Sequence, residues 1–364
     1  MTKFIPGLKL SEIFYKEAVK PILDTDFPRL KYSTARIDRG SDVLGFDTPQ
    51  SMDHDWGPRL LLFLSETDYK KYSKKIDETL RIKLPHTIRG FPTSFGKPDE
   101  KGIRVLENID RELVYHNVII YTIRSFFEEY LGINPYENIS VMDWLTFPQQ
   151  KLSTITSGKV FHDDLDLNRI RQKFAYYPRD VWLYILAAQW TRISQEEPFI
   201  GRCGDIGDEL GSKIIASRLV RDIMKLCFLM EKKYHPYMKW FGASFSKLSC
   251  SRKLLPIFNK VLSAKDWKER EKYLSLAYET VAKIHNNLKI TKPMPTKVSR
   301  FHERPYLIIH ADTFASEIKK AIKDREIKRI KSDIGALDQF TDSTDVADNP
   351  AIVKKLRDVL EEII

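Results

Sequence analysis

Strand-like runs are confined to the first half of the chain, and this asymmetry constrains the architecture more than any other feature of the sequence. Beyond Tyr176-Tyr177-Pro178 the pattern becomes almost entirely helical, with apolar residues every three or four positions. The sequence therefore predicts an α+β chain, in which a small α/β domain is followed by an all-α domain. The strand-like runs occupy residues 30–37, 59–64, 112–122 and 157–164.

Residues 207–233 show the helical pattern of the second half well. Their apolar residues share one face, and the charged residues Arg218, Asp222 and Lys225 lie opposite. Further helices are predicted at 10–23, 66–84 and 265–288, after Thr122 up to a cap at Gly132, and after Asn349-Pro350. Loops are predicted at 85–102, which is rich in Pro and Gly, and at the polar, acidic segment 338–350, which we expect to be mobile.

These shifts in pattern predict four parts in the 364-residue chain. They are an N-terminal helix at 1–30, an α/β domain at 31–166, a helical domain at 167–300, and a C-terminal strand and helix extension at 301–364.

The charge balance is basic, with a formal net charge of +10 and a pI near 9.2. A polyanionic partner, either a nucleoside triphosphate or a nucleic acid, would suit this charge. A lysine-rich surface in contact with solvent explains it equally well. Charge alone therefore does not decide between them.

Targeting and redox signals point to the cytoplasm. No apolar run approaches the roughly 18 residues of a membrane span, and the N-terminal segment lacks the features of a secretory signal. Cys203, Cys227 and Cys250 are widely spaced and form neither a disulfide framework nor a zinc pattern. We expect each to be an ordinary buried thiol in a reducing compartment.

One stretch carries candidate chemistry: GSDVLGFDTPQSMDHDWGPRLLLFL, residues 40–64. If Asp53 and Asp55 lie on a strand, their carboxylates point to the same face and repel each other unless a cation lies between them or one of them is protonated. Mg²⁺ or Mn²⁺ suits such oxygen ligands. Gly40 allows close backbone approach, and Ser41 offers a hydroxyl and an amide to a phosphate. The alternative is an acidic turn in contact with solvent.

This stretch resembles the signature of DNA polymerase beta-like nucleotidyltransferases, in which Gly-Ser precedes Asp-x-Asp and an apolar strand. Further blocks, among them FFEEYLG, DWLTFPQQKLSTITSGKVFHDD and GRCGDIGDELGS, resemble an uncharacterised, largely prokaryotic branch of that superfamily. The resemblance covers about residues 30–310. It implies a mixed sheet joined to a helical domain similar to that of aminoglycoside nucleotidyltransferases.

The resemblance also implies roles for individual residues. Asp53 and Asp55 would bind two Mg²⁺ ions with the nucleoside triphosphate, and Gly40 and Ser41 would hold its β- and γ-phosphates. An acceptor hydroxyl would attack the α-phosphorus and pyrophosphate would leave.

A third carboxylate, usual in the superfamily, is missing from the expected strand, where Ile119 and Ile120 stand instead. Asp163 is the first substitute, and a solvent-exposed turn before a helix is its alternative. Other acidic residues flank the two strands: Asp110, Glu112, Asp164 and Asp166.

Glu209 is a second candidate base for the acceptor hydroxyl, with Asp208 as the helix cap. Its alternative is purely structural, a favourable negative charge at a helix N-terminus. Arg89, Arg202 and Lys239 could neutralise triphosphate charge, or could be solvated surface residues.

The predicted function is therefore transfer of a nucleoside monophosphate from a nucleoside triphosphate to a hydroxyl acceptor, which could be a small molecule, an RNA or a protein. The alternatives are a nucleotide-binding protein with weak or no turnover, a toxin-type enzyme that modifies RNA or protein, and a structural RNA-binding module. The nucleotide, the acceptor and the oligomeric state stay open.

Overall fold

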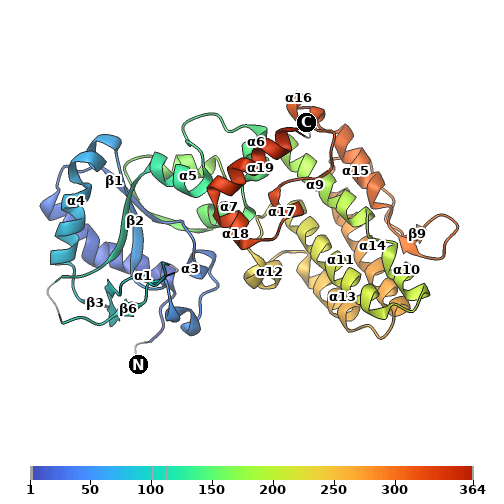
Figure 1. The fold of residues 1–364 in the computed structure, drawn as a ribbon, viewed down its shortest axis with the longest axis horizontal. Coiled ribbons are helices and arrows are strands. Elements are labelled where there is room, and N and C mark those ends of the chain that lie inside the picture. Colours follow the sequence, from blue (N-terminus) through green and yellow to red (C-terminus); the bar gives the residue numbers. More distant parts are fainter. Residues whose placement is uncertain (1–2, 101, 111–112, 363–364) are drawn as a thin grey trace. The chain divides into compact units, whose positions relative to one another are not determined.

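The computed structural model describes residues 3–100, 102–110 and 113–362, and the chain forms two compact units (Figure 1). The first unit comprises Met1–Ile139 and Lys151–Ala175, and the second comprises Ser140–Gln150 and Tyr176–Ile364. In this division residues 1–30 belong with the sheet, and residues 301–364 belong with the helices. The α+β class predicted from the sequence is confirmed.

A four-stranded mixed sheet forms the centre of the first unit, in the order β7-β2-β1-β8. Strand β1 is antiparallel to both β2 and β8, and β2 is parallel to β7. The four strands are β1 (Tyr32–Arg36), β2 (Arg59–Leu64), β7 (Asn117–Thr122) and β8 (Lys159–Asp163). Each lies within one of the four strand-like runs of the sequence.

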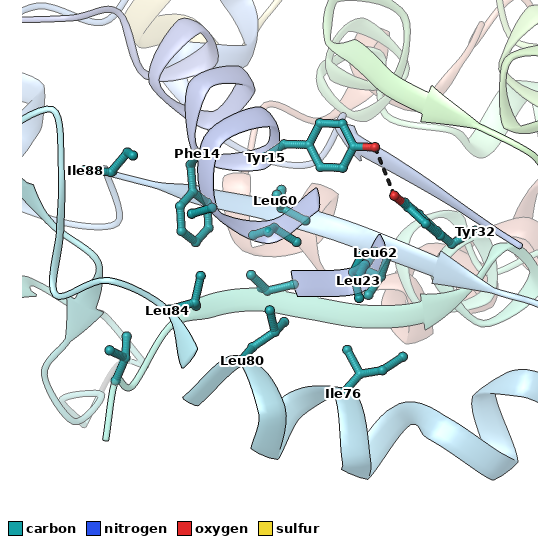
Figure 2. Packing of buried hydrophobic residues seen from close by; sticks show 14 of the residues in the cluster. Phe14, Tyr15, Leu23, Tyr32, Leu60, Leu62, Ile76, Leu80, Leu84 and Ile88 are labelled. Carbon is teal, nitrogen blue, oxygen red and sulfur yellow. Dashed lines mark hydrogen bonds between the residues drawn. The ribbon is translucent and has the colours of Figure 1, made fainter. Parts of the chain in front are cut away.

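Strand β2 has the composition of a central strand, because all six residues of RLLLFL are buried. On one face of β2, Leu60, Leu62 and Leu64 join a large apolar cluster with the N-terminal helices and helix α4 (Glu66–Lys83) (Figure 2). On the opposite face of the strand, the ring of Phe63 packs edge-on against Phe126, with 5.5 Å between ring centroids.

The N-terminal helical segment runs from Gly7 to Asp26 and supplies much of that cluster. It consists of α1 (Gly7–Phe14), a π-helical turn (Tyr15–Val19) and α2 (Lys20–Asp26). The Tyr15 and Tyr32 hydroxyls lie 3.2 Å apart and link this segment to β1 (Figure 2). The segment is longer than the predicted 10–23 helix at both ends.

Capping residues explain where the other helices of the first unit begin and end. In α4 (Glu66–Lys83) the Ser65 hydroxyl accepts the N–H of Asp68, and α5 (Ile123–Leu131) ends at Gly132 in the left-handed conformation, as predicted. The remaining elements are α3 (Ser41–Leu44), a 3₁₀ turn (Pro49–Asp53), α7 (Gln149–Ser157), whose first two residues belong to the second unit, α8 (Leu167–Gln172), and the short strands β3 (Thr87–Ile88), β4 (Phe91–Pro92), β5 (Ser94–Phe95) and β6 (Leu106–Glu107).

The second unit is helical except for one small hairpin, β9 (Ser299–Arg300) with β10 (Leu307–Ile308). Its helices are α6 (Val141–Thr146), α9 (Arg179–Ser194), α10 (Phe199–Asp205), α11 (Glu209–Met230), α12 (Met238–Phe245), α13 (Ser251–Ser263), α14 (Trp267–Asn287), α15 (Ala311–Lys320), α16 (Arg325–Arg329), α17 (Leu337–Phe340), α18 (Thr344–Asp348) and α19 (Pro350–Glu362). None of the described helices is both long enough and apolar enough to cross a membrane.

Two predictions for this unit are wrong. Segment 338–350 is not simply a loop, because it contains parts of α17 and all of α18, and the carboxylate of Asp338 accepts the N–H of Gln149 at 2.9 Å. Asp222 and Lys225, predicted opposite the apolar face of α11, are only 2% and 7% exposed. Residues distant in sequence cover that face: the carbonyl of Asp338 accepts a hydrogen bond from Lys225, and Gln189 donates to the carbonyl of Asp222.

Truncation of the fully buried Leu62 tests the apolar cluster. We expect Leu62→Ala to lower the free energy of unfolding by about 2–5 kcal/mol, because the substitution leaves a cavity on β2. Urea unfolding followed by circular dichroism measures the change. Ile82→Ala is the matched control, because Ile82 on α4 is 65% exposed and should change stability by less than about 0.5 kcal/mol. Equal effects of the two substitutions would contradict the assigned core.

Candidate functional site

The loop at residues 37–58 carries the Gly-Ser pair and both candidate aspartates. It joins the end of β1 to the start of β2, and these strands are antiparallel neighbours with Ala35 opposite Leu61. The loop therefore leaves and re-enters the sheet at the same end. The start of β7 lies at this end too, because Asn117 is paired with Arg59.

A buried ion cluster holds the base of this loop. Arg36, the last residue of β1, donates to both carboxylate oxygens of Asp42, at 3.0 Å from Nε and 3.1 Å from Nη2. Arg59, the first residue of β2, donates to the same carboxylate at 3.2 Å. The three side chains therefore tie both strand ends to α3.

Electrostatics in this cluster follow from burial and pairing. Arg36 and Asp42 are 1% and 2% exposed. Burial acts to raise the pKa of the Asp42 carboxyl, but the charges and hydrogen bonds of Arg36 and Arg59 outweigh it and the pKa is lowered. Burial, together with the charge of Arg59, lowers the pKa of Arg36 to about 10. Arg36 and Asp42 therefore stay charged at neutral pH.

Gly40 has to be glycine because of this cluster. Its backbone has φ 150° and ψ 143°, and a Cβ atom there would lie 2.0 Å from an Asp42 carboxylate oxygen and 2.6 Å from the Arg36 guanidinium. Ser41 begins α3, is partly exposed, and its hydroxyl makes no hydrogen bond to the residues that the structure describes. That hydroxyl is available to a ligand.

A second anchor fixes the middle of the loop. The carboxylate of Asp47 accepts the backbone N–H of Gly7 at 2.6 Å and the indole N–H of the buried Trp56 at 3.1 Å. The loop is thereby tied to the start of α1.

Asp53 and Asp55 do not lie on a strand, so the prediction that a strand aligns their carboxylates is wrong. Asp53 ends the 3₁₀ turn, Asp55 has a left-handed backbone with φ 45°, and β2 begins only at Arg59. The backbone N–H of Asp55 donates to the carbonyl of Arg104 at 2.9 Å, and its Oδ1 accepts the N–H of Arg104 at 3.2 Å. This pairing with a distant segment produces the turn.

Asp53 remains the most accessible carboxylate of the loop. Its side chain is 64% exposed, and its ion-pair partner is the neighbouring His54, with 2.9 Å between Nδ1 and Oδ1. Slight desolvation acts to raise the pKa of Asp53, but the His54 hydrogen bond and charge outweigh it, so the pKa is lowered. The group is ionised at neutral pH and open to solvent.

Arg104 is a supporting residue that the sequence did not reveal. Its guanidinium donates to the backbone carbonyls of Gly96 at 3.1 Å and Tyr115 at 3.1 Å, and so it joins the segment before β7 to the Asp55 turn. Arg36, Asp42 and Arg59 were missed as well. The sequence did hold a signal for the two arginines, because one stands at each of the strand ends that flank the loop.

Asp163 lies at the opposite end of the sheet from the loop. It ends β8 and is paired with Ser33, three residues before the end of β1, or about 10 Å along the strand. Its carboxylate accepts the Ser33 hydroxyl at 2.7 Å and the N–H groups of Leu167 and Asn168 at 2.8 and 2.9 Å. The observed contacts give Asp163 a structural role at the start of α8.

Among the described residues of the first unit, no hydrogen bond or ion pair joins the other candidates to Asp53 or Asp55. Arg89 is exposed in the turn between β3 and β4 and forms an ion pair with Glu17. Ile119, where a carboxylate was sought, is 41% exposed on β7. Asp110 is exposed, and Glu112 lies outside the described residues. The described part of the chain contains no cluster of three His, Cys, Asp or Glu side chains that could hold a metal ion.

Glu209, Arg202 and Lys239 belong to the second unit. Glu209 begins α11, where its carboxylate accepts from the buried Arg270 at 2.9 Å, while the Asp208 side chain caps the helix by accepting the N–H of Gly211 at 2.7 Å. The guanidinium of Arg202 and the ammonium of Lys239 lie over neighbouring aromatic rings, those of Phe199 and Trp240. These contacts match the structural alternatives that the sequence left open.

Part of the second unit matches a known protein family. Residues 144–241, about a quarter of the chain, match a family described as "Domain of unknown function (DUF4037)". A search of curated proteins finds no match. The chain is similar to the crystal structure of a nucleotidyltransferase-like protein from Exiguobacterium sibiricum 255-15, at 9% identity and a TM-score of 0.31, over 79% of this chain and 83% of that one. We infer nothing from a likeness at that level.

Substitution of Asp42 and of Asp53 distinguishes the buried anchor of the loop from its exposed carboxylate. We expect Asp42→Asn to lower the free energy of unfolding by about 3–5 kcal/mol, because Arg59 loses its buried counter-charge and Arg36 keeps only its ion pair with Asp38. Asp53→Asn should change it by less than about 0.5 kcal/mol, because the side chain is exposed. Thermal and urea unfolding of both variants measure the difference. A larger loss for Asp53→Asn than for Asp42→Asn would show that the assignment of anchor and exposed group is reversed.

Proposed function

We propose that the chain is a nucleotidyltransferase, which transfers a nucleoside monophosphate from a nucleoside triphosphate to a hydroxyl acceptor. One observation carries the proposal: a loop held at its base by buried ion pairs presents an accessible Gly-Ser turn and an exposed, ionised Asp53 at one end of a mixed sheet. The sequence resemblance to DNA polymerase beta-like nucleotidyltransferases, carried by the same residues, supports it.

The donor chemistry of Asp53 and Asp55 fits a magnesium ion that arrives with a nucleotide. Mg²⁺ is commonly held by one or two carboxylates, with phosphate oxygens and water completing its six ligands. The exposure and lowered pKa of Asp53 suit this use. Bound there, the ion would neutralise phosphate charge.

Each residue of the loop has a distinct task in this proposal. The Ser41 hydroxyl and the backbone at Gly40 bind phosphate oxygens, and the glycine at position 40 lets this turn pack directly against Asp42 and Arg36. The acceptor oxygen forms a bond to the α-phosphorus, the bond from that phosphorus to the pyrophosphate oxygen breaks, and the acceptor proton passes to solvent or a carboxylate. Arg36, Asp42 and Arg59 position the loop and do not touch the reacting groups.

We restrict the reacting carboxylates to Asp53 and Asp55. Asp163 and Glu209 are engaged by structural hydrogen bonds, as described above, and would have to give these up to act as bases. Arg89 remains a candidate contact to the triphosphate, since it lies in the same unit as the loop and its ion pair with Glu17 is exposed.

Nucleotide binding without turnover is the second candidate function. Ile119 and Ile120 on β7 favour it, because they occupy the strand that was expected to supply a third carboxylate. Two carboxylates can hold one magnesium–nucleotide complex, whereas a two-metal mechanism needs more ligands.

A measurement of pyrophosphate release distinguishes nucleotide transfer from nucleotide binding without turnover. We expect release from at least one of the four nucleoside triphosphates when Mg²⁺ and total cell extract, as the acceptor pool, are present. Excess chelator should stop the release, and added Mg²⁺ or Mn²⁺ should restore it. The double variant Asp53→Asn, Asp55→Asn should lose about a hundredfold or more of the rate, because the metal ligands are removed.

Glu128→Gln is the control for that double variant, because Glu128 is an exposed carboxylate on α5 away from the loop. Unchanged release by the double variant would contradict the site. Nucleotide binding without release by the unmodified protein would favour the second candidate function.

A further inference from the structure

A cavity of about 300 Å³ lies within the second unit, between α9, α11 and residues 333–342. Three basic side chains line it: Arg192 from α9, and Arg221 and Lys225 from α11. Acidic side chains line it as well, among them Asp338 and Asp342. Its volume is at the lower limit of cavities that bind small molecules.

Lys225 is a buried cation with one direct hydrogen-bond partner among the described residues, although the charges of Asp338, Asp222 and Asp342 also act on it. It is 7% exposed, and its ammonium donates to the backbone carbonyl of Asp338 at 2.5 Å. Among the described residues no carboxylate lies within ion-pair distance of this ammonium. Burial, the largest influence, lowers its pKa. A buried ammonium with one acceptor for three N–H groups is costly unless something in the cavity accepts the others.

The two arginines also keep unused donors. The Nε of Arg221 is buried and has no hydrogen-bond partner among the described residues, while its Nη1 pairs with the exposed Asp342 at 2.9 Å. Arg192 donates a long hydrogen bond from Nη1 to the Gln195 side chain at 3.4 Å, and it lies 3.5 Å from the Glu196 carboxylate and 3.9 Å from that of Asp222. The basic groups of this cavity are therefore only partly satisfied by the protein.

We infer that this cavity binds a small molecule that carries a single phosphate group. Guanidinium groups bind phosphate oxygens through paired N–H donors, and a lysine ammonium adds a compact positive charge. A phosphate on the Lys225 and Arg221 side of the cavity would accept the donors that the protein leaves unused.

The acidic groups narrow the class of ligand. Three acidic side chains, Asp333, Asp338 and Asp342, balance the three basic ones, so the cavity lacks the excess positive charge that a triphosphate would need. The same carboxylates can accept hydrogen bonds from hydroxyl groups. The ligand is accordingly a small phosphate monoester with hydroxyl groups, and this inference is independent of the nucleotidyltransferase proposal, which concerns the first unit.

Binding of glycerol 3-phosphate to the full chain, measured by isothermal titration calorimetry at constant ionic strength, tests the inference. We expect one saturable site per chain. Lys225→Met should weaken binding about tenfold or more, because it removes the charge and keeps the length of the side chain. Lys213→Met is the matched control, since Lys213 is an exposed lysine on the same helix, and should leave the affinity within twofold.

Two further variants make the result unambiguous. Arg221→Gln should weaken binding by a similar factor, which covers the case that Lys225→Met does not fold, as judged by circular dichroism. The double variant Asp53→Asn, Asp55→Asn should bind glycerol 3-phosphate normally, so failure of the nucleotidyltransferase proposal would not affect this result. Absence of saturable binding at millimolar ligand, equal weakening by Lys213→Met, or normal binding by folded variants of both Lys225 and Arg221 would overturn the inference.

Discussion

The ion cluster of Arg36, Asp42 and Arg59 is the interaction on which the geometry of the proposed site depends. Its arginines end β1 and begin β2, and its aspartate lies in the short helix after the Gly-Ser turn. A buried ion pair adds little net stability compared with apolar packing, but loss of one partner is costly. We interpret the cluster as a device that fixes one conformation of the loop and leaves Asp53 free for a ligand.

The apolar pattern predicted the strands and the α+β class, because burial of a central strand such as RLLLFL is visible in its own residues. It did not predict how Asp53 and Asp55 are held. Asp55 is paired with Arg104, almost fifty residues away, and that pairing imposes a turn that local alternation does not reveal. Likewise, Asp42 is one charged residue among many in the sequence, and its burial depends on two arginines from different strands.

In the helical unit the prediction failed where distant segments cover a polar helix face. The spacing of apolar residues in α11 correctly identified its core side, with Leu219 and Ile223 fully buried. It could not show that Asp222 and Lys225 are buried too, since the covering residues come from α9 and from 333–342, over a hundred residues later in the case of the C-terminal segment. Those long-range contacts also form the cavity that we assign to a phosphate monoester. The spacing of apolar residues in the sequence could therefore not predict this cavity.

The most direct test of the central claim is a crystal structure of the full chain with Mn²⁺ and a non-hydrolysable nucleoside triphosphate, in which anomalous scattering locates the metal. The account predicts a manganese peak bound by carboxylate oxygens of Asp53 and Asp55 and by phosphate oxygens, with the phosphates next to Gly40 and Ser41. A nucleotide-bound manganese ion that neither aspartate contacts would contradict it.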